Sequence, residues 1–487
     1  MSAKPTPAHP AASSGPIEPP VPSAEIDASC RVPVMVLFVS AAIWALVASA
    51  FGLLATLKFH GPSLLADCPW LTYGRVHPAY LNALIYGFAV QAGLGALLWM
   101  ISHLGRTSLT FAPGIVFGAI FWNLGVTVGI IGILAGENTG HEWLEIPRYG
   151  SLLLFTGYLL IGLGAMRTFQ QRRVQPLYIS QWFLLAAVFW FPWIYSTAEF
   201  LLVAKPVRGA LQAALNGWYI NNLTVVWFGF IGLAALFYFI PKITKRPLHS
   251  HYLGIFAFWL LALFGSWGGI APGTPLPSWM AALSTVAAVL TIVPILAVVI
   301  NFRRTIAGGY GSVLATVPGK FLLFGLAAFI VSGLFAALTS LETVSLVTNF
   351  TWVLPAQTQL AIFGFFAMTM FGAIYFIVPR LMGVEVCPRL AGAHFWVAAL
   401  GLVFYVVTLA LGGVMQGESM NLHATSFLEV VSGTLTFLRV STVGDFLLAV
   451  GNLLLLLNVA GVLYRVGRSA AQTAWAANQV KHAEVAS

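Results

Sequence analysis

The chain has 487 residues, of which 59% are hydrophobic and only 8% are charged. Soluble globular domains carry about 25% charged residues, so this composition excludes a soluble enzyme and an intrinsically disordered chain. The net charge of +9 comes from scattered Lys and Arg residues without a basic face, which excludes a nucleic-acid-binding protein. Cys30, Cys68 and Cys387 form no CxxC pair, so the sequence has no disulfide framework and no cysteine zinc site.

The two ends of the chain differ from the apolar middle. Residues 1–30 are predicted to form a disordered cytoplasmic tail, because this segment is rich in Pro, Ala and Ser and lacks apolar periodicity. Residues 31–465 are predicted to form the membrane domain, and residues 466–487 a cytoplasmic C-terminal tail. The first apolar run is long enough to cross a bilayer, so we expect a retained transmembrane helix there and no signal peptide.

Twelve segments of the middle region are apolar over the roughly 20 residues that a bilayer span requires. All have the length of helices, so the predicted fold class is an all-α integral membrane protein with twelve transmembrane helices. The predicted spans are 33–57, 79–101, 112–136, 149–167, 179–203, 217–241, 252–272, 279–301, 320–340, 355–378, 392–415 and 441–464.

The distribution of positive charge predicts the topology of these spans. Of the 23 Lys and Arg residues, six lie in the odd-numbered loops, and the others lie in the tails and the even-numbered loops. Positive charge accumulates on the cytoplasmic side of membrane proteins, so both termini are predicted to be cytoplasmic, in a bacterial-type inner membrane. The six residues are Lys58, Arg75, Arg148, Lys205, Arg208 and Arg439.

Ionisable residues inside the predicted spans are few. Glu199 lies in the fifth span and Asp445 near the start of the twelfth. Acids within a membrane are costly and often mark proton or ion paths, which makes Glu199 a candidate proton carrier. Each acid could instead lie near an interface and bond to a neighbouring hydroxyl. No histidine falls in the middle of a predicted span, so we expect the ten histidines to be interfacial polar residues.

A series of short motifs gives the chain a family resemblance. In their order and spacing these motifs resemble subunit I of the haem-copper oxidases, most closely the cbb3-type cytochrome c oxidase. The resemblance covers about residues 33–463 and implies the twelve-helix bundle of that subunit. The motifs are TYGRVHP at 72–78, NALIYGF at 82–88, WFPWIY at 190–195, WYINN at 218–222, YFIPK at 238–242, RP at 246–247, GAIYFIVP at 372–379, HFW at 394–396 and GVMQG at 413–417.

The resemblance also implies where metal ligands belong, and this chain departs from the family at each position. Tyr80 replaces the low-spin haem histidine of the second helix, and Asn221 replaces the copper histidine of the sixth. Gln357 and Gln359 replace the His-x-His pair of the tenth helix, which supplies one ligand to each haem. The segment 268–274 lacks the two further copper histidines.

The tyrosine that cross-links to a copper ligand in the family matches His251 in this alignment. Amides are poor ligands for haem iron or copper, so we expect no haem, no copper and no catalytic residue in this chain. Tyr80 could still bind ferric haem as a phenolate.

Three functions remain open at this point. The first is a degenerate oxidase subunit that is structural or docking in role, embedded in the lipid bilayer beside other respiratory subunits or a cytochrome c. The second is an active terminal oxidase or nitric oxide reductase, which would hold haem b and copper and take electrons from cytochrome c. The third is a proton or small-molecule transporter that uses Glu199.

Overall fold

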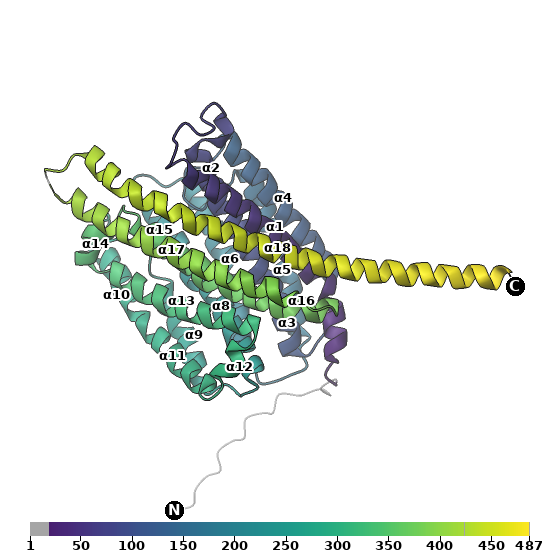
Figure 1. The fold of residues 1–487 in the computed structure, drawn as a ribbon. Coiled ribbons are helices and arrows are strands. Elements are labelled where there is room, and N and C mark those ends of the chain that lie inside the picture. Colours follow the sequence, from purple (N-terminus) through teal and green to yellow (C-terminus); the bar gives the residue numbers. More distant parts are fainter. Residues whose placement is uncertain (1–18, 423, 487) are drawn as a thin grey trace, which may run out of the picture.

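The computed structural model describes residues 19–422 and 424–486, and this part of the chain is helical and contains no strand. Neighbouring helices often follow each other without a break, and we call such a continuous stretch a rod (Figure 1). The elements are α1 (Ser23–Leu57), η1 (Pro69–Leu71), α2 (Tyr73–Asn82), η2 (Ala83–Ala89), α3 (Val90–Gly105), α4 (Ala112–Ala135), α5 (Arg148–Gln170), α6 (Ile179–Ala198), η3 (Glu199–Ala204), α7 (Leu211–Asn221), η4 (Asn222–Phe228), α8 (Gly229–Thr244), α9 (His251–Gly265), α10 (Ser278–Leu290), α11 (Ile292–Ile306), α12 (Tyr310–Leu314), α13 (Val317–Thr339), α14 (Glu342–Thr348), α15 (Val353–Gln359), η5 (Leu360–Ala367), α16 (Met368–Met382), α17 (Pro388–Met420) and α18 (Phe427–Ala486).

Three rods form the centre of the bundle. The most apolar window of rod 73–105 is fully buried, and those of rods 211–244 and 353–382 are 89% buried. The other apolar helices bury no more than half of theirs, as expected for helices with one face toward lipid. The central rods also contact one another, through η2 with η5, η4 with η5 and α3 with α8.

Eleven helical stretches in the described residues are long and apolar enough to cross a membrane. The expected count of twelve is therefore not confirmed. The difference lies at the predicted span 252–272, where α9 ends at Gly265 after only 15 residues. Gly269 adopts a left-handed φ of +96°, and Pro272 follows, so the chain leaves the helix before the predicted end.

The first helix begins earlier than expected. Residues 1–18 of the predicted tail lie outside the described residues, but α1 starts at Ser23 and so includes residues 23–30 of that tail. Asp27 anchors this start, because its carboxylate accepts hydrogen bonds from Trp99 Nε1 at 2.9 Å and His103 Nε2 at 2.8 Å. Ile26 and Cys30 are buried on the same turns. Contacts with α3 thus extend the helix toward the N-terminus, beyond the predicted apolar span 33–57.

Small residues allow neighbouring helices to approach closely. A Cβ atom on Gly118 of α4 would lie 2.8 Å from the carbonyl oxygen of Gly157 on α5, and one on Gly157 would lie 2.7 Å from Gly118 O. Such contacts between small residues are a common basis of helix packing in membranes, where hydrophobic burial does not distinguish protein from lipid.

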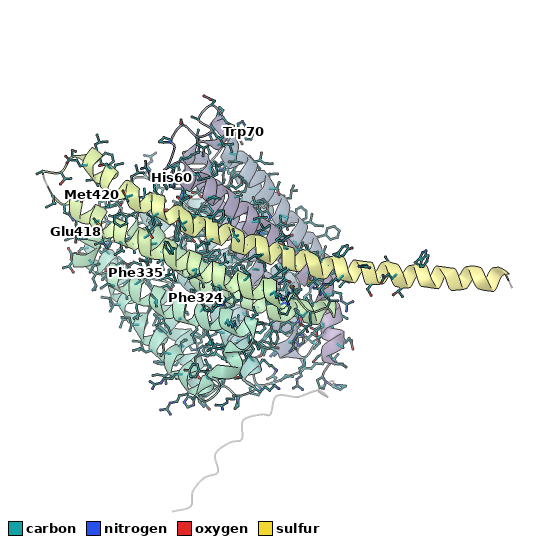
Figure 2. The ribbon with its side chains drawn as sticks, in the orientation of Figure 1. His60, Trp70, Phe324, Phe335, Glu418 and Met420 are labelled. Carbon is teal, nitrogen blue, oxygen red and sulfur yellow. The ribbon has the colours of Figure 1, made fainter. Side chains whose placement is uncertain are left out.

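His60, Trp70, Glu418 and Met420 lie toward one end of the bundle, which we call the His60 end (Figure 2). The opposite end carries the start of α1, where Arg31 Nε donates to Leu381 O at 2.8 Å near the end of α16. α18 packs along α17 and α1 and then continues past the bundle as a single helix (Figure 1). The positive-charge distribution makes the His60 end the expected outer side.

Two of the three cysteines can test this orientation. Cys68 lies in the loop at the His60 end and Cys387 lies between α16 and α17 at the opposite end, and both thiols are free and partly exposed. In right-side-out membrane vesicles, a membrane-impermeant maleimide should label Cys68, whereas labelling of Cys387 should require permeabilisation. Cys68→Ser and Cys387→Ser variants identify the labelled site. Labelling of Cys387 alone in sealed vesicles would reverse the orientation.

Candidate functional site

The candidate site residues lie at π-helical segments. η4 begins directly after Asn221 and η5 directly after Gln359. η2 begins three residues after Tyr80, and η3 begins at Glu199 itself. π-Helical turns are rare and occur frequently at functional sites, because the wider turn reorients neighbouring side chains. Four of the candidate residues from the sequence, Tyr80, Glu199, Asn221 and Gln359, thus lie at or within three residues of a π-helical segment.

Tyr80 and Gln359 meet at the centre of the bundle. The side-chain amide Nε2 of Gln359 donates directly to the hydroxyl oxygen of Tyr80, and both residues are buried. The two residues come from different central rods, and both stand at positions where the resemblance leads us to expect haem ligands in the family. The structure thus brings together this pair of the four expected residues.

Gln357 and Asn221 have partners elsewhere. Gln357 Oε1 accepts a hydrogen bond from Thr339 Oγ1 of α13 at 2.8 Å. Asn221 Nδ2 donates to the carbonyl oxygen of Gly265, at the end of α9, at 2.7 Å. Among the hydrogen bonds of the described residues, none joins Asn221 to Tyr80 or to either glutamine.

Backbone fills the space beside Asn221. A Cβ atom on Gly268 would lie 2.7 Å from Asn221 Oδ1, and one on Gly217 would lie 2.3 Å from the carbonyl oxygen of Gly269. Real Cβ atoms do not come this close to other atoms. The contact between α7 and the segment after α9 therefore has room only for glycine. The next residue, Asn222, is fully buried and accepts from Trp190 Nε1 at 3.2 Å.

The structure corrects the position matched to the cross-linking tyrosine. His251 is the first residue of α9, whereas Asn221 contacts Gly265 at the last residue of the same helix. At 1.5 Å per residue, these two ends of α9 are separated by about 21 Å. The residue of α9 beside Asn221 is therefore Gly265, and the alignment of His251 to that position was wrong.

A buried chain of hydroxyl groups lies near Glu199. Ser151 Oγ donates to Glu199 Oε1 at 2.9 Å, and the hydroxyl of Tyr195 is an electrostatic neighbour of this carboxyl group. Tyr219 lies beside Tyr195, with ring centroids 6.4 Å apart, and its hydroxyl is 2.6 Å from that of Tyr86. Glu199 thus bonds to a hydroxyl, as the alternative interpretation from sequence expected, while also adjoining a line of polar groups.

Glu145 is a buried acid that lies between two of the predicted spans, 112–136 and 149–167. Its side chain is only 6% exposed, and Oε2 accepts from Asn82 Nδ2 at 2.7 Å. Burial raises the pKa of Glu145 from 4.5 to about 7, an effect that the hydrogen bond from Asn82 opposes in part. Asn82 is the first residue of the otherwise apolar NALIYGF motif. This polar residue was the sequence feature that could have indicated a buried polar partner such as Glu145.

His394 also differs from the sequence interpretation. It was expected at an interface, but it is fully buried on α17, where Nδ1 lies 3.0 Å from the hydroxyl of Tyr375. Phe321 and Phe371 pack against its ring. In the part of the chain that the structure describes, no three or more His, Cys, Asp or Glu side chains are grouped as metal ligands are.

Comparison with known proteins agrees with the fold and with the motifs. Residues 32–447 match the family described as Cytochrome C and Quinol oxidase polypeptide I. The cbb3-type cytochrome c oxidase subunit CcoN1 of Stutzerimonas stutzeri is 25% identical over 388 residues, which cover 77% of this chain and 81% of the relative. A cytochrome c oxidase subunit 1 homolog from Bradyrhizobium diazoefficiens is 25% identical over 89% of this chain and 82% of its own length.

A solved structure has a similar fold. A chain of a heme-copper terminal oxidase dimer, determined by cryo-electron microscopy, superimposes with a TM-score of 0.68. The match covers 88% of this chain and 84% of that chain at 14% sequence identity. The bundle described above is therefore the fold of that oxidase chain, retained at low sequence identity.

The contact between Gly217 and Gly269 can be tested by adding one methyl group. Gly217→Ala forces a Cβ atom against the carbonyl oxygen of Gly269, and overpacking of this kind costs about 1–3 kcal/mol. We expect a lower melting temperature for the purified variant in detergent. Gly229→Ala is the matched control on the same rod, because the nearest atom to its Cβ is 3.5 Å away. Equal stability of both variants would contradict the close backbone contact.

Glu145 should make stability depend on pH. The folded protein binds this proton more tightly than the unfolded chain does, so the stabilisation is complete below pH 4.5 and is lost as the pH rises through about 7. A pKa difference of this size corresponds to about 3 kcal/mol. Melting temperatures should therefore fall between about pH 5 and pH 8, and Glu145→Gln should reduce this fall. Glu137→Gln, at an exposed position of the same loop, should leave it unchanged.

Proposed function

Since this chain belongs to the Cytochrome C and Quinol oxidase polypeptide I family, we propose that it is a subunit I-like respiratory membrane protein without haem or copper of its own. In this proposal its role is structural or docking, beside a catalytic oxidase subunit or a cytochrome c. We place it in a bacterial-type plasma membrane with both termini in the cytoplasm. The relatives named above are themselves oxidase subunits, which supports membership of a larger complex.

The observation that carries the proposal is the contact between Gln359 and Tyr80. Axial ligands of a haem lie on opposite faces of the porphyrin, so an iron atom and its ring must fit between them. Here the two side chains are directly hydrogen-bonded. The cavity beside Tyr80 has a volume of about 10 Å³, which is enough for one water and far too small for a porphyrin.

The chemistry of the side chains supports the same conclusion. An amide nitrogen has no available lone pair, and an amide oxygen is a weak ligand for iron or copper compared with imidazole. Gln357 and Asn221 also use their polar atoms in bonds to Thr339 and Gly265. These residues do not fit a haem or a copper ion.

The backbone contacts near Asn221 support the absence of a copper site. Two of the family's copper ligands belong to the segment after the seventh helix, and in this chain that segment touches α7 through Gly268 and Gly269. A side chain at either position would collide with Asn221 or with Gly217. Ligands from this segment could reach Asn221 only after the corner had opened.

In place of cofactor binding, we assign these polar residues a role in holding helices together. Each amide joins two elements that are distant in sequence: Gln359 joins α15 to α2, Gln357 joins α15 to α13, and Asn221 joins α7 to α9. Hydrogen bonds between membrane helices contribute about 0.6–2 kcal/mol each. The amides thus keep a shared scaffold rigid without a metal.

A second candidate function is favoured by the chain of hydroxyl groups beside Glu199. Ser151, Tyr195, Tyr219 and Tyr86 extend from this carboxyl group into the bundle, and such a line of hydrogen-bonding groups is suited to carry protons. This geometry supports a proton transporter as the alternative. It lacks a described continuation to the opposite end, so the subunit role remains the primary proposal.

The proposal is tested by the cofactor content of the purified chain. We expect a pyridine haemochrome assay to find well below one haem per chain and elemental analysis to find no stoichiometric copper. Oxygen or nitric oxide reduction by the isolated chain should also be absent. A heme-copper terminal oxidase purified and assayed in parallel provides the positive control.

Two different results would contradict the proposal. One or more retained haems per chain would refute the proposal, and loss of that haem in Tyr80→Phe would identify phenolate ligation by Tyr80. Proton flux into liposomes that hold the chain but no electron donor, and its loss in Glu199→Gln, would favour the transporter instead.

A further inference from the structure

Asp445 is a buried acid that the proposed function does not use. Its side chain on α18 is 6% exposed, and Oδ2 has no hydrogen-bond partner in the described part of the chain. It lies one helical turn after Thr442, which contacts His60 Nε2 at 3.0 Å. Asp445 is therefore near the His60 end of the bundle, where Figure 2 shows His60.

Asp445 lines a small cavity, which we call the inner chamber. Its volume is about 10 Å³, close to the minimum that holds one water molecule. Hydroxyl groups reach it from four elements: Thr56 from α1, Tyr73 and Tyr80 from α2, Tyr405 from α17, and Ser441 from α18 itself. These groups could supply the several hydrogen bonds that a buried water requires.

The titratable groups around the inner chamber leave the carboxylate without a counter-ion. Tyr73, His77 and Tyr80 face it from α2 and Tyr405 faces it from α17, while α1 contributes only the hydroxyl of Thr56. Among the described residues that line the chamber, none is Lys or Arg. An isolated buried carboxylate is strongly disfavoured, so Asp445 is stable as the neutral acid.

A second, larger cavity adjoins the chamber and opens to solvent. This outer vestibule has a volume of about 290 Å³ and is lined by Lys58, Phe59, Pro62, Ala66, Thr72 and Tyr73. Phe59 and Tyr73 line both cavities, and their ring centroids are 5.5 Å apart. Two aromatic side chains thus form the partition between solvent and the chamber of Asp445.

We propose that Asp445 is a proton-binding site that is filled from the His60 end. A hydronium ion in the outer vestibule breaks one O–H bond and remains there as water, while its proton passes Phe59 and Tyr73 and forms a new O–H bond on the carboxylate of Asp445. Release reverses the same step. This site is separate from the hydroxyl chain of Glu199.

Infrared spectroscopy of the purified protein tests the proton on Asp445. The chain contains only three aspartates, so ¹³C-labelled aspartate gives carboxyl bands from Asp27, Asp67 and Asp445 alone. Asp67 is exposed and Asp27 pairs with His103, so we assign to Asp445 any band of a protonated, labelled carboxyl group at neutral pH. That band should be present in the wild type and absent in Asp445→Asn.

Exchange into D₂O tests the path. Ala66→Trp places an indole in the outer vestibule at an exposed position and leaves Asp445 intact, so it should slow the isotope shift of the Asp445 band several-fold. Ser63→Trp is the control, because Ser63 is exposed on the same loop but lines neither cavity.

Two results would overturn the inference. The first is a labelled wild-type protein without a protonated aspartate band, which shows that Asp445 is ionised. The second is an isotope shift equally fast in Ala66→Trp and Ser63→Trp, which shows that protons reach Asp445 by another route. Neither measurement requires the Asp445→Asn variant to fold, since both use chains with the native aspartate.

Discussion

The structure depends on the burial of three helical rods at the centre of the bundle, at 73–105, 211–244 and 353–382. Inside a bilayer, a polar group that meets neither water nor a partner costs several kcal/mol, which favours internal hydrogen bonds for the amides and hydroxyls on these rods. This preference explains the cross-bundle bonds of Gln359, Gln357 and Asn221, which each join elements distant in sequence. It also explains why acids such as Glu145 are paired with an amide from a central rod.

Hydropathy predicted the fold class well, because apolar length alone determines which segments can cross a bilayer. It missed the end of the seventh helix, which stops at Gly265 before the left-handed Gly269, since glycine affects backbone conformation without marking a break in hydropathy. The motifs identified the candidate positions, and their partners could not be read from sequence. An amide can bond to a neighbouring side chain or to a backbone carbonyl with equal ease, and Asn221 bonds to a carbonyl. The burial of Glu145 could not be predicted from hydropathy, because this residue lies in a connection between two spans.

In our proposal, amides stand where the family has imidazoles, a change that keeps a polar side chain and lowers metal affinity. The bundle superimposes on a chain of a heme-copper terminal oxidase with a TM-score of 0.68, although the two sequences are only 14% identical. The packing of the bundle is therefore compatible with very different sequences. Fold and chemistry are separable in such a family, and the function has to be argued from the site. In our proposal, the bonds among the substituted side chains take over part of the cohesion that bound cofactors would provide.

The π-helical segments constrain how this bundle can change. A π turn contains more residues than an α turn, and each residue added to an α-helix rotates the rest of the helix by about 100°. Loss of a single residue from η5 (Leu360–Ala367) would restore α geometry and rotate Gln357 and Gln359 by about that angle relative to α16. Single-residue insertions and deletions at these segments therefore turn a different set of side chains toward the centre. The side chains at the centre of this bundle can therefore change in evolution by single-residue insertions and deletions as well as by substitutions.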